Sequence, residues 1–165
     1  MVRLLALLAT LALAFPAHAQ KDSKLLRQLA EANLAEVQAG KLGAEKGTED
    51  DVKRYGERMA KGHGEHLDEL RKIAKSNKVD LPSSPSKKHQ DALKKLRDAK
   101  KGAAFDKAYM AQMVKDHEEA LKLHESAAKN AEDKDVRDAA QKAIPDVRQH
   151  LDTAKGIQSS LKSGR

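Results

Sequence analysis

The 165-residue sequence contains no cysteine and no tryptophan, and it has only two tyrosines, two phenylalanines and four prolines. Without cysteine the chain forms no disulfide and carries no lipid anchor on a cysteine, so its stability must come from packing or from a bound ligand. Aromatic side chains are also too few to build a stacking surface for single-stranded nucleic acid. We therefore expect no nucleic-acid partner.

Long apolar runs are equally scarce, and the one that is present lies at the N-terminus. Arg3 precedes an apolar stretch from Leu4 to Phe15, and a small-residue site ends at Ala19. This arrangement is typical of a secretory signal peptide, and the stretch is too short to span a membrane comfortably. We expect residues 1–19 to be removed by cleavage after Ala19, and the protein to reside in a bacterial periplasm.

The remaining residues, 20–165, suit one domain with a real core. The formal net charge is +7, but 32 basic residues alternate with 25 acidic residues along the chain and do not form one block. Such a pattern is typical of a solvated, mildly basic surface. The charge also leaves open a peripheral contact with the anionic envelope surface, and the pattern does not indicate an oligomeric state.

Apolar residues recur with a period near 3.6 in four long segments, and no segment alternates as a strand would. The chain is therefore predicted to be all-α. Two short connections make antiparallel hairpins of the first and last pairs of helices, while some 25 residues join the second helix to the third long one. This connectivity favours a ferritin-like four-helix bundle with a long crossover that contains a short extra helix, and an up-and-down bundle is the alternative topology. The helices are expected over about 22–46, 48–77, 86–100, 104–130 and 133–161.

Histidines lie on the apolar faces of three of these helices, and a glutamate lies on that of the fourth. A buried ionisable group is costly unless it finds a partner, so we compared the heights of these residues along the bundle. Glu36 and His63 differ by about 4 Å in height relative to the turn between their helices, at 1.5 Å per residue. His117 and His150 lie at similar depths from the second turn. Glu36, His63, His117 and His150 are therefore predicted to converge in one layer.

Two interpretations of this layer remain open. Three imidazoles and a carboxylate suit a transition-metal site for zinc, copper or iron. The same residues can instead form a satisfied polar cluster that only fixes the register of the helices. His66, Asp116 and His124 are secondary ligand candidates; we expect His66 at the rim and His124 in place of an apolar core residue. His89 carries no such signal.

The frame Tyr-x3-Met-x-Lys-x-His occurs twice, ending at His63 and at His117. Together with the stretches "LAEVQAGKLGAEKG", "VKRYGERMAKGHGEHLDEL", "AFDKAYMAQMVKDHEEALKL" and "AIPDVRQHLDTAKGI", these frames resemble the bacterial domain-of-unknown-function 4142 family (DUF4142) over nearly the whole mature chain. Members of this family are often labelled predicted outer-membrane proteins, and their fold is regarded as ferritin-like.

This resemblance implies a periplasmic helical bundle in which Glu36, His63, His117 and His150 occupy recurrent positions. His124 departs from the family pattern, which usually has an apolar or aromatic residue there. The family has no established biochemical function. This chain lacks the Glu-x-x-His pairs of di-iron ferritin-like proteins, so a ferroxidase centre is not expected. The sequence favours either a metal-binding envelope protein or a structural and interaction module. An enzyme is the less favoured interpretation, and the sequence does not exclude it.

Overall fold

The computed structural model describes residues 17–164, so the expected signal peptide lies almost entirely outside the described residues. The described chain is all-helical, as predicted. The helix expected from residue 22 begins earlier, and the other four begin and end within two residues of the expected positions. The helices are α1 (Ala17–Lys46), α2 (Asp50–Ser76), α3 (Lys87–Asp98), α4 (Ala103–Asn130) and α5 (Lys134–Ser163).

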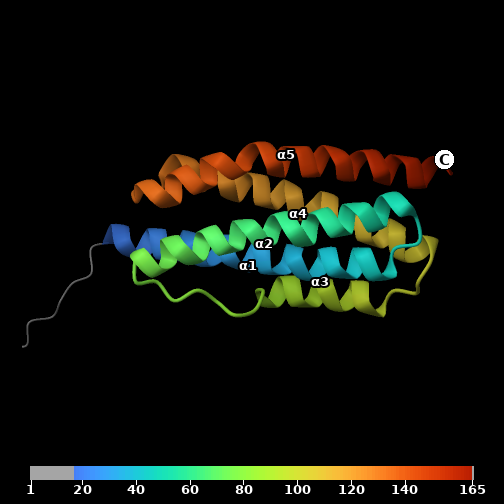
Figure 1. Cartoon of the computed structure of the whole chain (residues 1–165), viewed down its shortest axis with the longest axis horizontal. Coiled ribbons are helices and arrows are strands. Elements are labelled where there is room, and N and C mark those ends of the chain that lie inside the picture. The colour runs from blue at the N-terminus through green and yellow to red at the C-terminus, as the bar shows by residue number, and fades with distance from the viewer. Residues whose placement is uncertain (1–16, 165) are drawn as a thin grey trace, which may run out of the picture.

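The four long helices lie side by side, and the chain connects them as two antiparallel hairpins (Figure 1). α1 packs mainly against α2, and α4 packs mainly against α5, while smaller contacts join α2 to α5 and α1 to α4. α2 and α4 run in the same direction, as a long crossover between them requires (Figure 1). Within the described residues, no helix has the length and apolar character needed to cross a bilayer.

The crossover between α2 and α4 carries the short helix α3, which packs along α1 and contacts α4. Leu93 and Leu96 of α3 are buried. At its end, the carbonyl oxygens of Arg97 and Ala99 accept hydrogen bonds from Lys46 Nζ at 2.6 and 2.8 Å. Because the last carbonyls of a helix have no partner within it, this lysine fixes the C-terminus of α3 to the end of α1.

Each hairpin also caps the turn of the other hairpin with a buried aspartate. The carboxylate of Asp106, in the first turn of α4, accepts hydrogen bonds from the backbone N–H groups of Thr48 and Glu49 at 3.0 Å each. The carboxylate of Asp22, near the start of α1, accepts from the N–H of Asp133 at 2.6 Å. These bonds satisfy N–H groups at the starts of α2 and α5, which have no acceptor within their own helices.

A polar layer divides the apolar interior into two clusters. The layer contains one buried polar side chain from each long helix: Glu36, His63, His117 and His150. One cluster, near the turn between α1 and α2, includes Tyr55, Met59, Phe105, Tyr109 and Met113. The other, near the opposite end of the four helices, includes Leu26, Leu29, Leu70, Ala127 and Val136. Along the sequence of each long helix, the polar residue of the layer lies between residues of the two clusters. The polar layer is thus enclosed by packed apolar side chains on both sides.

Candidate metal centre

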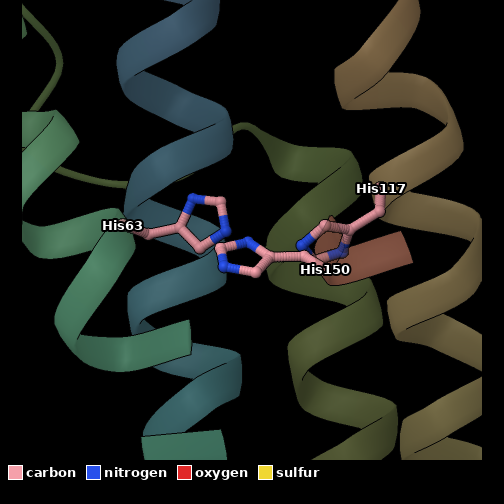
Figure 2. Close-up of side chains that lie close together, drawn as sticks. All are labelled: His63, His117 and His150. Carbon is pink, nitrogen blue, oxygen red and sulfur yellow. The ribbon is translucent and has the colours of Figure 1, made fainter. Parts of the chain in front are cut away.

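Three histidines from three helices meet in the polar layer. His63 of α2, His117 of α4 and His150 of α5 point toward one another (Figure 2). One ring nitrogen from each lies within 4.8 Å of the other two, and their ring centroids are 5.4 to 5.6 Å apart. All three are buried, with 3%, 0% and 7% of their surface exposed. The structure therefore brings together three of the four residues that the sequence analysis placed in one layer.

The spacing along each helix explains why these side chains face inward. His63 lies four residues from both Met59 and Leu67, and these side chains share one face of α2 because residues four apart are neighbours on a helix surface. His117 likewise lies four residues after Met113, which is fully buried. The apolar neighbours determine which face each helix buries, and the histidines are carried into the interior with them.

Hydrogen bonds orient two of the three rings. His63 Nδ1 lies 2.9 Å from Asn33 Oδ1, while the Asn33 amide donates to the carbonyl oxygen of Leu29 at 2.8 Å. The amide oxygen must accept, so His63 Nδ1 carries the hydrogen. His117 Nδ1 lies 2.9 Å from the carbonyl oxygen of Met113, to which it can only donate. In both rings, Nε2 is therefore left with a free lone pair.

Each ring also has one buried nitrogen without a hydrogen-bond partner. These nitrogens are His63 Nε2, His117 Nε2 and His150 Nδ1. Buried polar atoms in folded proteins are nearly always paired, and an unpaired one costs about 1–3 kcal/mol. Three such nitrogens thus lie in neighbouring rings of the polar layer.

Burial keeps these imidazoles uncharged. It lowers the pKa of His117 to about 4, against an opposing contribution from the hydrogen bond to Met113. Burial likewise lowers the pKa of His150 to about 4, while nearby Asp146 acts in the opposite direction. The pKa of His63 lies well below its ordinary value because of burial first and the neighbouring histidines second. Neutral imidazole is the form that binds metal ions.

Glu36 lies beside this group and not within it. Its Oε1 is 3.7 Å from His117 Nδ1, the nitrogen opposite the unpaired one, and its Oε2 has no partner. Burial, and secondarily the charge of Asp116, raises the pKa of Glu36 well above its usual range. Burial thus disfavours the charged form of both His117 and Glu36 where the two side chains meet.

The secondary candidates lie outside the group of three. His66 is partly exposed, with Nε2 3.4 Å from Asp146 Oδ2, consistent with the expected rim position. His124 is buried in the core, and it lines a separate cavity of about 10 Å³ together with His66. Asp116 faces another pocket, where it lies with His89 and Glu119.

Sequence reasoning missed two residues around these sites. Asn33 orients His63, and its only signal was its position in the apolar stripe of α1. His89 lies in the amphipathic helix of the crossover, and its neighbours on α4 depend on how that helix packs. No periodic pattern in the sequence fixes that packing.

The donor set fits a borderline transition metal. Three neutral imidazoles are common ligands of zinc, copper and iron, and a three-histidine set leaves a further coordination position open. Around a tetrahedral zinc ion with bonds of about 2.0–2.1 Å, ligand nitrogens are roughly 3.4 Å apart. Because the ring nitrogens already lie within 4.8 Å of one another, a zinc ion would draw them together by at most about 1.4 Å, the difference between 4.8 and 3.4 Å.

Comparison with known proteins bears on the fold and the family. No curated protein matches the chain. A crystal structure of a DUF305 fragment from Deinococcus radiodurans is similar, with a TM-score of 0.70 and 13% sequence identity, over 88% of this chain and 97% of that one. At this identity the likeness shows a shared fold alone. The family described as "domain of unknown function (DUF4142)" matches residues 8–157, and the chain belongs to that family.

Proposed function

We propose that this protein is a transition-metal-binding protein whose site is formed by His63, His117 and His150. One observation carries the proposal: three buried imidazoles from three helices each keep a ring nitrogen without a partner, and one nitrogen from each lies within 4.8 Å of the other two. A cation bound between the rings would accept a lone pair from one nitrogen of each neutral imidazole. A layer that served only register would be expected to pair these atoms with one another or with the backbone.

The neighbours of the rings support this assignment. Metal-binding histidines usually donate their second ring nitrogen to a carbonyl or a carboxylate, which fixes the ring and makes it a better ligand. His63 donates to Asn33, and His117 donates to Met113 with the Glu36 carboxyl group nearby. We assign Glu36 to this supporting role and not to direct coordination, which revises the four-ligand set expected from the sequence.

The wider setting belongs to the same proposal. We infer a ferritin-like four-helix bundle, supported by the two hairpins, the long crossover and the parallel direction of α2 and α4 (Figure 1). We also infer export to the periplasm, supported by the basic residue, apolar stretch and small-residue site at the N-terminus. Mass spectrometry of the secreted protein tests the second inference. A mature chain that begins at Gln20 is expected, and an uncleaved N-terminus would contradict it.

Calorimetric titration of the mature protein, purified without a metal-affinity tag, tests the metal site. We expect zinc to bind tightly at one histidine site per chain, and the melting temperature to rise with zinc concentration because only the folded chain holds the site. His63→Ala and His150→Ala should lose this tight binding. The Asp152→Asn protein is a control, because Asp152 is exposed on α5 and lies outside the site.

Two results would contradict the proposal. The first is the absence of tight binding for zinc, copper and iron alike. The second is tight binding that the histidine variants retain. Loss of stability in these variants without any effect of metal would instead favour the alternative interpretation, a structural module in which the layer only fixes helix register.

A further inference from the structure

A second cluster of candidate ligands lies at a pocket between α1, α3 and α4. The pocket has a volume of about 280 Å³. Its wall includes three side chains that can bind a cation, His89 from α3 and Asp116 and Glu119 from α4, and each offers one ligand atom within 4.8 Å of the other two. All three are partly buried, so the cluster is open to solvent while the group of three histidines is not.

The local structure holds this cluster in place. Asp116 and Glu119 are three residues apart and share one face of α4. Gln112 Nε2 donates to both carboxylate oxygens of Asp116, at 2.8 and 2.9 Å. His89 Nδ1 lies 3.0 Å from the hydroxyl of Ser86, the N-cap residue of α3. The crossover helix thereby brings an imidazole against two carboxylates of α4, a mixed oxygen and nitrogen set that suits divalent transition metals.

Glu36 connects this pocket to the interior. It lines the same pocket, yet only 4% of its surface is exposed, and its Oε2 has no partner. Its other oxygen lies 3.7 Å from His117 Nδ1. A buried carboxyl group with a free oxygen therefore lies between the solvent-open cluster and one of the three core histidines.

We propose that His89, Asp116 and Glu119 form an outer cation site from which a divalent transition metal passes, by way of Glu36, to the three core histidines. This inference rests on the proposed function. The core histidines are enclosed by apolar clusters on both sides along the helices. The pocket thus approaches them from the side, and Glu36 lies between its outer cluster and His117.

Lys88 opposes binding at the outer site. Its ammonium group pairs with Glu119, and a metal ion would have to displace it. Lys88→Gln should therefore strengthen metal binding at the outer site, whereas Asp116→Asn should weaken it. The asparagine side chain would keep an oxygen for the hydrogen bond from Gln112, so this variant removes the charge and a ligand with little change in packing.

Stoichiometry and loading rate together test the proposal in the mature protein, with Co²⁺ or Zn²⁺ as the probe. We expect two ions per chain, one tight and one weaker. Asp116→Asn and His89→Ala should each lose the weaker ion and slow the loading of the tight site at least tenfold. The release rate should fall by the same factor, because an access path changes both rates and leaves the affinity of its end point unaltered. Asp152→Asn serves as the matched control for lost charge.

Glu36→Gln should slow the loading of the tight site. If the outer variants load the core site at the wild-type rate, the proposal is overturned, whatever their stoichiometry. His63→Ala separates this inference from the proposed function, because it should lose the tight ion and keep the weaker one. A single ion that His63→Ala removes and Asp116→Asn leaves unchanged would support the core site and overturn the outer one. Ion binding that only the outer variants abolish would contradict the proposed function.

Discussion

His117 shows, at the scale of a single residue, what the polar layer contributes and what it costs. The side chain is fully buried, and its Nε2 has no partner. Leucine at this position would bury no unpaired polar atom. We therefore expect His117→Leu to raise the free energy of unfolding of the metal-free protein by about 1–2 kcal/mol, and to abolish stabilisation by zinc.

Urea denaturation with and without zinc measures both effects. A metal-free His117→Leu protein that is clearly less stable than wild type would contradict the account. That result would show that His117 stabilises the packed helices without a metal ion. Its contacts would then contribute more to stability than its unpaired nitrogen costs.

His124 gives a residue-scale prediction for pH. Burial lowers its pKa to about 4, first through loss of water and then through nearby His66, against a hydrogen bond with the backbone of Ala140. The pKa in the unfolded chain is about 6.5, so between about pH 6.5 and 4 the unfolded state binds a proton that the folded state does not. Stability is therefore lost as the pH falls through this window.

A buried histidine of this kind lowers the free energy of unfolding by roughly 1.4 kcal/mol for each unit by which the pH falls between about 6.5 and 4. His124→Leu should reduce the difference in stability between pH 7 and pH 4.5 by roughly 2–3 kcal/mol, measured by urea denaturation at both pH values. An unchanged difference would show that folding does not lower the pKa of His124.

Glu36 affects the pH dependence of stability in the opposite direction, because its raised pKa gives stability at low pH that is lost as the pH rises. Glu36→Gln should therefore make the free energy of unfolding fall more steeply as the pH is lowered.

At the scale of helices, Gly40 and Gly56 allow α1 and α2 to approach until their backbones touch. A Cβ atom on Gly56 would lie 2.5 Å from the backbone nitrogen of Ala44 and 2.6 Å from the carbonyl oxygen of Gly40. Backbone atoms within two packed helices cannot move aside easily. Gly56→Ala should therefore destabilise the protein by about 1–3 kcal/mol.

Gly64→Ala is the matched control on the same helix, because a Cβ there would meet no atom within 4 Å. Alanine is the better helix former, so this change should stabilise the protein by about 0.5–1 kcal/mol. Thermal denaturation of the two variants should thus shift in opposite directions. Equal shifts would contradict the close approach of α1 and α2.

The helices themselves were largely predictable from the sequence, because long amphipathic segments carry a clear 3.6-residue period and the turns between them are short. The exception is the start of α1, which was expected at Asp22 and lies at Ala17. Aspartate is common at helix N-termini, but the Asp22 carboxylate instead accepts from the turn between α4 and α5. The distant partner of a capping side chain cannot be identified from local sequence.

At the scale of the whole molecule, Asp22 and Asp106 fasten the two hairpins to each other at opposite ends. Both are buried, and each accepts hydrogen bonds from backbone N–H groups of the other hairpin. Replacement of either by alanine leaves these groups without their acceptor and should lower the free energy of unfolding by about 1–3 kcal/mol.

The double variant should lose the sum of the two single losses to within about 0.5 kcal/mol, since the sites share no partner. Urea denaturation of the two single variants and the double variant tests this expectation. A single variant as stable as wild type would show that its carboxylate does not hold the hairpins together.

The site was predictable at this scale only in part. Depth along four helices was enough to place His63, His117 and His150 in one layer, because helix rise is constant. Depth does not specify the direction of each side chain within the layer. Glu36 therefore shares the predicted layer but contacts His117 at Nδ1, not at the unpaired Nε2. His89 was missed because its contact with α4 depends on the path of the crossover, which no periodic pattern determines.

X-ray absorption spectroscopy of the protein, loaded with less than one zinc ion per chain, shows directly whether His63, His117 and His150 bind a metal ion. We expect a zinc ion with three imidazole nitrogens at about 2.0–2.1 Å, and loss of that imidazole signal in His63→Ala. A spectrum with oxygen ligands alone, or a protein that retains no zinc after dialysis, would contradict the assignment of His63, His117 and His150 as a metal site.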